Sequence, residues 1–285
     1  MNKKHIICNQ SFDLERSLYN LKDAIVKDCQ FQGDADGESC LKETRDIEMA
    51  HCLFDLRYPL WHADTYYMHH CEMTENARAP IWYSKNGLIE NCQLNGIKLL
   101  RECDLTALKN CKIDSPEFGW YCRDIKMDNC KITSPYIFLN SRNIELNNIN
   151  YIGKYSFQYI ENLHIKNSYL DTKDAFWHSS NILVENCTLK GEYLAWFSKN
   201  LTLVNCTIIG TQPFCYAENL KLVNCKMIET DLAFEYSSVD ADVQGKIESV
   251  KNPKSGLIIC DEVGEVIFED AIIPCKGEVK IRNTN

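Results

Sequence analysis

The sequence predicts an all-β fold, a single-stranded parallel β-helix whose coils stack on one another, and three observations support this. Eight asparagines recur at every nineteenth position along the chain. Runs of alternating apolar and polar residues, typical of short β-strands, flank each of them. The 3.6-residue spacing of a helix explains none of these runs. The asparagines are Asn91, Asn110, Asn129, Asn148, Asn167, Asn186, Asn205 and Asn224.

The repeat extends beyond these eight positions. A cysteine follows six of the asparagines, and Asp28-Cys29, His51-Cys52, His70-Cys71 and Val243-Gln244 occupy the same two columns. We therefore expect about 12 to 13 coils of about 19 residues, each with three short strands. Because a solenoid buries its core between neighbouring coils, we predict one domain over residues 1–285.

Both ends depart from the repeat. Residues 1–28 are predicted to form an N-terminal cap or first coil, with Ser11 to Asn20 as either a short helix or part of that coil. Residues 238–285 lose the Asn-Cys pattern and are predicted to form atypical C-terminal coils or a cap.

Asparagine at each bend has a physical reason. Its side chain tolerates left-handed backbone angles and can bond the local main chain. Stacked at the ~4.8 Å separation of adjacent strands, each amide can also donate to the next, which would build an asparagine ladder. We favour the right-handed form, because the asparagine bend is typical of it and the left-handed form usually builds a shorter coil from hexapeptide units.

Composition limits the partners. The net charge is -9 and no cluster of Lys or Arg appears, so nucleic acid and anionic membrane surfaces are disfavoured. No apolar run approaches the ~18–20 residues of a membrane span, and the N-terminus lacks the apolar core of a secretion signal. We therefore expect a cytoplasmic protein that does not contact membranes.

Sixteen cysteines recur at the packing positions of the repeat rather than at metal-ligand spacing. Side chains in one column are ~4.8 Å apart, further than a disulfide favours, so we expect buried free thiols. His51, His69 and His70 form the only cluster that resembles a metal site, and we interpret it as a solvated corner. Neither a metal nor a cofactor is predicted.

One part of each coil does not repeat, and this third face is where we expect function. All five tryptophans fall in one of its columns, ten residues before the cysteine column, together with Arg101. The preceding column is apolar as far as Ala233, and the following column is mixed as far as Glu235. Carboxylates and histidines in that mixed column indicate that it reaches solvent through a bend after the Trp position.

Two interpretations of this face remain open. In the first, an exposed ladder of rings binds sugar rings or another planar ligand. In the second, the tryptophans cap the core and Arg101 and Glu102 are ordinary surface charges. The candidate ligand-binding residues are Trp61, Trp82, Tyr83, Trp120, Tyr121, Tyr159, Trp177 and Trp196.

The catalytic candidates do not complete a known constellation. They are His62, Arg101, Glu102, Asp174 and His178. Glu43 and Glu102 lie three coils apart, about 14 Å, whereas glycoside hydrolysis needs carboxyl groups about 5 to 9.5 Å apart. Two other carboxylate pairs come from neighbouring coils and stay possible as a catalytic pair: Glu102 with Glu117, and Asp174 with Glu192. Whether the protein is an enzyme is therefore undecided.

The non-repeating segments resemble a bacterial family of unknown function. The strings are DADGESCLKE (34–43), LRYPLWH (56–62), SPEFGWYC (115–122), GKYSFQY (153–159), TKDAFWH (172–178), DLAFEYS (231–237) and KNPKSG (251–256). The resemblance implies the pectin-lyase-like right-handed β-helix fold. It also implies a superfamily that contains many polysaccharide lyases and hydrolases, but no particular activity.

Three functional hypotheses follow. The first is a protein that binds or cleaves an oligosaccharide or sugar conjugate along the aromatic face. The second is a non-catalytic scaffold whose aromatic wall binds another protein or a second copy of the chain, giving a homo-oligomer. The third is a small-molecule enzyme with different chemistry.

Overall fold

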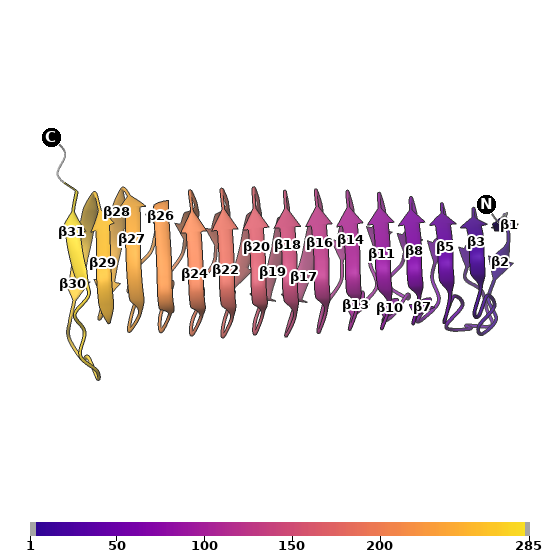
Figure 1. Cartoon of the computed structure of the whole chain (residues 1–285), viewed down its shortest axis with the longest axis horizontal. Coiled ribbons are helices and arrows are strands. Elements are labelled where there is room, and N and C mark those ends of the chain that lie inside the picture. The colour runs from indigo at the N-terminus through magenta and orange to yellow at the C-terminus, as the bar shows by residue number, and fades with distance from the viewer. Residues whose placement is uncertain (1–3, 283–285) are drawn as a thin grey trace. The chain divides into compact units, whose positions relative to one another are not determined.

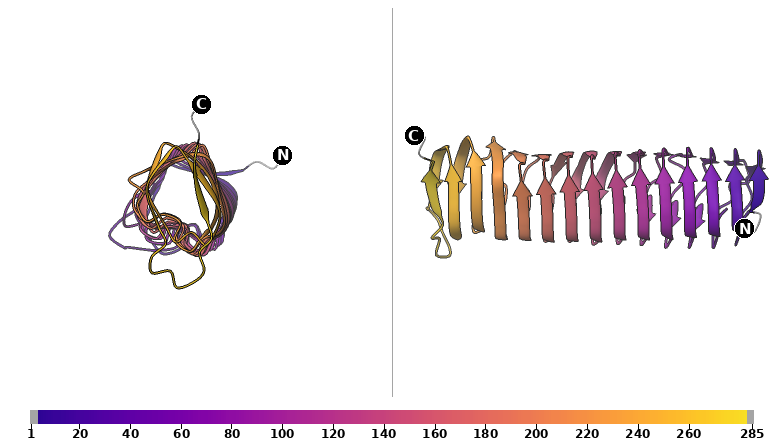
Figure 2. Two further views of the ribbon diagram at one scale, coloured as in Figure 1. Left: turned by 90° about the vertical axis from the view of Figure 1, so that its left-hand side faces the viewer. Right: turned by 45° about the horizontal axis from the view of Figure 1, so that its top comes forward.

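The computed structural model describes residues 4–282 and confirms the predicted parallel β-solenoid (Figure 1). The chain divides into two compact units, residues 1–145 and 146–285, and each is described by itself. The described residues form no α-helix, and therefore none that could span a membrane. Within single coils, the chain closes around an interior, as the left view of Figure 2 shows. Buried apolar side chains fill this interior.

Unit 1 consists of parallel strands in register. Its strands are β1 (His5–Cys8), β2 (Ser11–Phe12), β3 (Lys22–Lys27), β4 (Gln30–Phe31), β5 (Arg45–Ala50), β6 (Leu53–Phe54), β7 (Leu60–Trp61), β8 (Asp64–His69), β9 (Glu72–Met73), β10 (Ile81–Trp82), β11 (Lys85–Glu90), β12 (Gln93–Leu94), β13 (Leu100–Arg101), β14 (Asp104–Lys109), β15 (Lys112–Asp114), β16 (Arg123–Asp128) and β17 (Lys131–Ile137). The unit boundary falls within β18 (Arg142–Asn147). Leu88 pairs with Ala107, and Ala107 with Lys126, so the period of the sequence is the strand register itself.

Unit 2 follows the same pattern. Its strands are β19 (Asn150–Ser156), β20 (Glu161–Lys166), β21 (Tyr169–Lys173), β22 (Ser180–Glu185), β23 (Thr188–Lys190), β24 (Lys199–Val204), β25 (Thr207–Ile209), β26 (Glu218–Ile228), β27 (Ser238–Gln244), β28 (Lys246–Lys251), β29 (Ser255–Cys260), β30 (Glu262–Ile267) and β31 (Glu278–Ile281). Here Ile182 pairs with Leu201, and Leu201 with Leu220.

Left-handed backbone angles turn the chain at fixed positions of the coil. The repeating asparagines from Asn91 to Asn224 have φ values of 52 to 55°. A second row of asparagines, at Asn143, Asn162, Asn181, Asn200 and Asn219, also has positive φ. Asparagine accepts this conformation at lower cost than most residues, which explains its choice at both rows.

The side chains of these asparagines bond from coil to coil. In unit 1, Asn110 Nδ2 donates to Asn91 Oδ1 at 3.2 Å. In unit 2, Asn205 Nδ2 donates to Asn186 Oδ1 at 3.2 Å and Asn224 Nδ2 donates to Asn205 Oδ1 at 2.8 Å. One rung differs from the expected order, because Asn167 donates to Asn147 rather than to Asn148.

The second asparagine row is bonded in the same way, although it is not among the predictions. Asn181 donates to Asn162 at 3.1 Å, and Asn200 donates to Asn181 at 2.9 Å. Its period is visible in the sequence, but no cysteine follows these residues to draw attention to it.

The cysteines serve as small apolar residues of the core. All sixteen are free and fourteen are buried, with only Cys8 and Cys275 half-buried. Each thiol in the main column points at a carbonyl of the preceding coil, as Cys206 Sγ does toward Val184 O at 3.5 Å. Burial raises the pKa of the Cys215 thiol to about 12, so this thiol stays protonated and unreactive.

Several predictions at the chain ends need correction. The solenoid has about 15 turns rather than 12 to 13, because the end coils lack the asparagine and cysteine that the count relied on. Of the two alternatives left open for residues 11–20, a short helix or part of a coil, the structure has strand β2 and turns and no helix. Val243, not Gln244, pairs with Cys225, because the register shifts by one residue after Leu222.

Asn205 tests how much one rung of the amide row contributes. Asn205→Ala removes two side-chain bonds and leaves a residue with a Cβ at a φ of 53°, so we expect a loss of about 1–3 kcal/mol in the free energy of unfolding. Asn205→Gly removes the same bonds but tolerates the angle, so its loss should be smaller. Chemical denaturation of all three proteins measures this, and a glycine variant as stable as wild type would show that the amide bonds contribute nothing.

Candidate functional site

The tryptophans of the third face are half-buried and cap the core. Three of their indole N–H groups donate to backbone carbonyls of the next coil: Trp120 to Tyr136 O at 3.2 Å, Trp177 to Tyr193 O at 2.6 Å and Trp196 to Gln212 O at 2.9 Å. Trp61 and Trp82 are half-buried as well, and Trp82 Nε1 donates to Glu102 Oε1 at 3.4 Å. Of the two interpretations, the geometry favours core-capping tryptophans.

The residues that follow the tryptophan column reach solvent. Their φ values lie between 49 and 59°, so the backbone turns at this position and projects the side chain outward, as their polar content indicated. We call this set the ring row: His62, Tyr83, Glu102, Tyr121 and Asn140 in unit 1, and Tyr159, His178, Phe197, Tyr216 and Tyr236 in unit 2. Tyr236 replaces the predicted Glu235, and Phe234 replaces Ala233 in the column that points inward, because this coil is one residue longer.

In unit 2 the ring row is continuous. His178 stacks on Tyr159 with ring centroids 5.0 Å apart, and on Phe197 at 4.9 Å. Phe197 stacks on Tyr216 at 4.8 Å, with an angle of 12° between the rings. Inside this stack the ring faces cover one another and mainly the ring edges meet solvent. Because sugars pack on ring faces, the continuous stack is a poor sugar platform.

In unit 1 the ring row is interrupted. His62 stacks on Tyr83 at 5.1 Å, but the next two coils contribute Glu102 and then Tyr121. Tyr83 and Tyr121 are 43% and 45% exposed and lie two coils apart, about 9.6 Å at the strand separation of ~4.8 Å. The exposed carboxylate of Glu102 lies between them in the row.

Arg101 occupies a rung of the tryptophan column. Its guanidinium carbon lies 5.3 Å from the ring centre of Trp82, 5.4 Å from that of Trp120 and 5.5 Å from that of Tyr121. Its Nη1 is 3.8 Å from Glu117 Oε2. This planar cation therefore continues the stack of indoles and orients the carboxylate of the next coil.

The remaining catalytic candidates lie in packing environments. His62 and His178 belong to the ring row, where each stacks on an aromatic neighbour. Asp174 is buried, with 8% of its surface exposed. Burial raises the pKa of the Asp174 carboxyl above its usual value of 3.8, although Lys173 and Lys154 oppose the shift. The structure thus brings Trp82, Arg101, Glu102, Trp120 and Tyr121 together in unit 1, while Glu192 pairs with Lys173 at 2.7 Å in unit 2.

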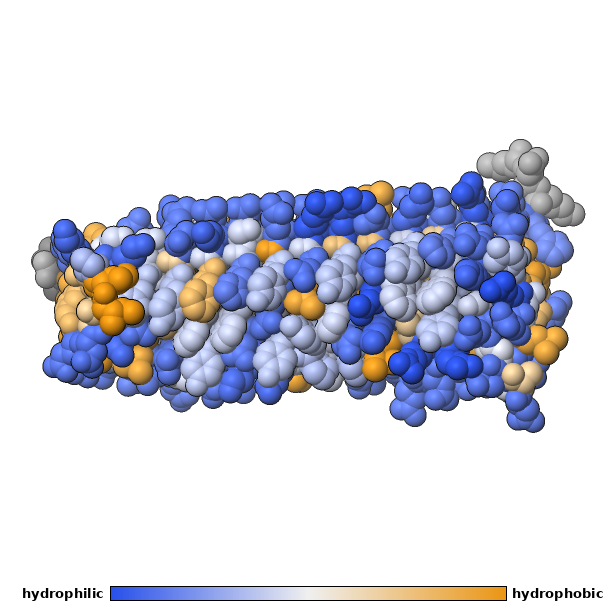
Figure 3. All heavy atoms as spheres, turned by 90° about the horizontal axis from the view of Figure 1, so that it is seen from below, coloured by the Kyte–Doolittle hydropathy of each residue, from blue (hydrophilic) through white to orange (hydrophobic). Residues whose placement is uncertain are grey.

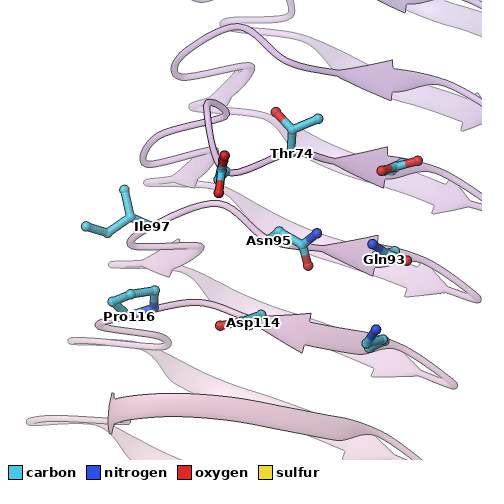
Figure 4. Close-up of a pocket in the computed structure, with 9 residues that line it drawn as sticks. Thr74, Gln93, Asn95, Ile97, Asp114 and Pro116 are labelled. Atoms are coloured by element: carbon cyan, nitrogen blue, oxygen red, sulfur yellow. The ribbon is translucent and has the colours of Figure 1, made fainter.

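A polar hollow of about 540 Å³ lies in the same unit (Figure 4). Its lining comes from three neighbouring coils: Glu72, Thr74 and Glu75; Gln93, Asn95 and Ile97; Lys112, Asp114 and Pro116. Glu72, Gln93 and Lys112 are paired in register on β9, β12 and β15. Polar groups therefore recur about 4.8 Å apart from coil to coil and about 6.7 Å apart along each strand.

An insertion builds one edge of the hollow. The step from Cys71 to Cys92 is two residues longer than the regular one. At the longer turn, Asp55 accepts hydrogen bonds from Thr74 Oγ1 and from Asn76 Nδ2, the latter at 3.1 Å. The hollow is not among the predicted sites, and the two extra residues are the sequence signal that marks it.

The hollow and the interruption of the ring row belong to the same three coils. Between them along the chain lie Lys98 and Glu117, whose charged atoms are 3.5 Å apart. Lys98 is three residues before Arg101, and Glu117 is four residues before Tyr121. Figure 3 shows one face of the molecule, on which pale side chains of intermediate hydropathy gather among blue polar ones.

Comparisons with known proteins identify a family and a fold. A family described as "Protein of unknown function (DUF3737)" matches residues 5–281. The surface adhesin PfbA of Streptococcus pneumoniae has a similar structure with a TM-score of 0.54 and 8% identity, over 82% of this chain and 83% of the adhesin. At that identity the similarity shows the fold alone. No curated protein matches the chain.

Two further structures are more distant. The A-module of mannuronan C-5 epimerase AlgE4 of Azotobacter vinelandii has a TM-score of 0.36 and 10% identity, over 98% of this chain and 91% of the module. The tailspike protein gp49 of Pseudomonas phage LKA1 has a TM-score of 0.31 and 10% identity, over 97% of this chain and 47% of the tailspike. These low scores carry no argument about function.

The burial of Asp174 predicts a pH dependence of stability. Because its pKa is raised, the folded protein binds this proton more tightly than the unfolded chain does. The resulting stabilisation is present below pH 3.8 and is lost as pH rises through the raised value. Asp174→Asn should therefore raise the free energy of unfolding at pH 7, with a gain that shrinks toward pH 4.

The matched control for this experiment is Asp171→Asn, since Lys190 Nζ binds Asp171 at 2.8 Å and no gain is expected there. Urea denaturation at several pH values measures both variants. An Asp174→Asn protein no more stable than wild type at pH 7 would contradict the assignment.

Proposed function

Since this chain belongs to the DUF3737 family of proteins of unknown function, membership assigns no activity, and we propose from the geometry that unit 1 binds an oligosaccharide. One observation carries the proposal: the three coils that form the polar hollow also carry Tyr83, Glu102 and Tyr121, the exposed stretch in which a carboxylate interrupts the ring row. Hydrogen-bonding groups and exposed rings on the same coils are the two components that sugar recognition requires.

The hollow supplies the hydrogen bonds. A sugar hydroxyl both donates and accepts, so it can pair with amides, carboxylates and an ammonium group. Gln93 and Asn95 lie on one coil, with Glu72 and Thr74 on one side and Lys112 and Asp114 on the other. This grid offers donors and acceptors at a spacing of about 5–7 Å, the scale of one pyranose ring.

The exposed rings supply the apolar contact. The faces of a pyranose carry C–H groups, which pack on the electron-rich face of an aromatic ring. Tyr83 and Tyr121 are 43% and 45% exposed, and Glu102 separates them in the ring row, so stacking between row members stops at Tyr83. Tyr83 also stacks on Trp82 at 5.4 Å, and Arg101 lies 5.5 Å from the ring centre of Tyr121. The carboxylate of Glu102 lies where it can bond hydroxyls of a sugar held beside Tyr121.

The charges select among saccharides. The lining of the hollow carries three carboxylates, of Glu72, Glu75 and Asp114, and one ammonium, of Lys112. An anionic uronate would be repelled, whereas a neutral or amino sugar would not. We therefore propose a neutral or amino-sugar oligosaccharide as the ligand.

The same geometry favours binding over cleavage. Glu117, the partner considered for Glu102, is bound by Lys98 at 3.5 Å and faces Arg101 at 3.8 Å. A carboxylate that two cations already contact is not free to reach the oxygen of a glycosidic bond. The pair thus lacks the general acid that hydrolysis of a glycosidic bond requires.

Calorimetric titration with neutral, amino-sugar and uronate oligosaccharides, chosen from a glycan-array screen, tests the proposal. We expect Gln93→Ala and Tyr121→Ala each to weaken binding at least tenfold, about 1.4 kcal/mol. The matched control is Phe197→Ala, because Phe197 is 40% exposed but stacks on both of its row neighbours, His178 and Tyr216. Absence of any saccharide ligand, or equal losses at Tyr121 and Phe197, would overturn the proposal.

A further inference from the structure

Two imidazoles converge on a corner of unit 1, just before Glu72 of the hollow along the chain. The Nδ1 atoms of His69 and His70 are 3.1 Å apart. On its other side, His69 Nε2 is 3.3 Å from Glu48 Oε1. The ring of His69 also stacks on Tyr67 at 4.6 Å, and the Tyr67 hydroxyl donates to Glu90 at 2.9 Å. His69 is therefore held in one orientation before any ligand arrives.

In the two coils before Asn91, histidine takes the place of asparagine. His51 and His70 occupy the positions that asparagine fills from Asn91 onward, with the same left-handed φ of 53°. Their rings stack at 5.1 Å with an angle of 18°, so imidazoles take over the column where amides could have bonded. The backbone of this corner does not require histidine, because asparagine satisfies it at the following coils.

The contact with Glu48 determines which nitrogen of His69 is free. A carboxylate accepts a hydrogen bond, so Nε2 carries the proton and Nδ1 of the neutral ring presents its lone pair to His70. A metal-bound histidine usually donates its second nitrogen to a carboxylate, which fixes the tautomer and makes the ligating nitrogen more basic. His69 has this arrangement.

We infer that His69 and His70 bind a divalent transition-metal ion through their Nδ1 atoms. With metal–nitrogen bonds of about 2.0–2.1 Å, two ligands at a tetrahedral ion are about 3.3 Å apart, and two at right angles are about 2.9 Å apart. The observed separation of 3.1 Å lies between these values. His70 can ligate through Nδ1 only when its ring proton is on Nε2. A proton that starts on Nδ1 therefore moves to Nε2, and the neutral ring keeps one proton.

The site offers few protein ligands and a defined chemistry. Residues 4–282 contain no group of three or more His, Cys, Asp or Glu side chains placed to hold a metal, so water completes the coordination. Imidazole nitrogen suits Zn²⁺, Ni²⁺ and Cu²⁺, whereas Ca²⁺ and Mg²⁺ prefer oxygen. Protons compete for the same nitrogens, so affinity should fall as pH is lowered.

Calorimetric titration of the full chain with NiCl₂ and ZnCl₂ at pH 7.5 tests this inference. The parent protein for the experiment carries Cys8→Ser and Cys275→Ser, because these two thiols are the only ones not buried. Cu²⁺ is avoided because it oxidises thiols. We expect one saturable site, weakened at least tenfold by His70→Asn and by His69→Gln.

Each variant has a structural rationale. His70→Asn places at this corner the residue that the next coils carry, so its thermal unfolding without metal should match that of the parent. His164→Gln is the control, because His164 also contacts a carboxylate, Glu185 at 2.7 Å, without a converging second imidazole. The inference would be overturned if the parent showed no saturable binding, or if both His70→Asn and His69→Gln bound the metal as well as the parent does. A loss of binding in one variant alone would leave that histidine as the ligand.

Discussion

Every feature of this molecule depends on the in-register stacking of parallel coils. Each coil donates backbone N–H groups to its neighbours, as Lys199 N does to Ser179 O at 2.8 Å and Glu218 N to Ser198 O at 2.9 Å. A fixed register brings equivalent residues into columns, so the chemistry of one position is repeated at each coil. Left-handed corners then determine which columns face the interior and which face solvent.

This constraint explains how much the sequence could predict. The regular recurrence of asparagine and cysteine was sufficient for the parallel β-solenoid, because the recurring residues are those that the corners and the core require. The outward turn at the ring row also followed, since Glu102 and His178 would be costly to bury. The terminal coils did not follow, because they lack the marker residues and the register shifts by one residue between Leu222 and Cys225.

The candidate site was harder to predict for a physical reason. Alternation along a strand separates inside from outside, but it does not say whether an exposed ring has a free face. That depends on the residue one coil away: Phe197 covers His178, whereas Glu102 ends the stack of row members at Tyr83. Likewise the hollow depends on a two-residue insertion after Met73, whose consequence becomes clear only when three coils are seen together. Both features of the proposed site therefore lie where the repeat is broken.

The requirement for register is tested most directly by deleting whole and incomplete coils from unit 2. Removing residues 183–201 takes out one complete coil and joins Ile182 to Thr202, which occupies the position of Leu183 in the pairing of the two strands. Removing residues 183–200 takes out one residue fewer and turns Leu201 and Leu203 to the opposite face of the strand. Circular dichroism and thermal unfolding should show a cooperative, β-rich protein after the first deletion and loss of cooperative unfolding after the second. Equal stability of the two deletions would contradict the account.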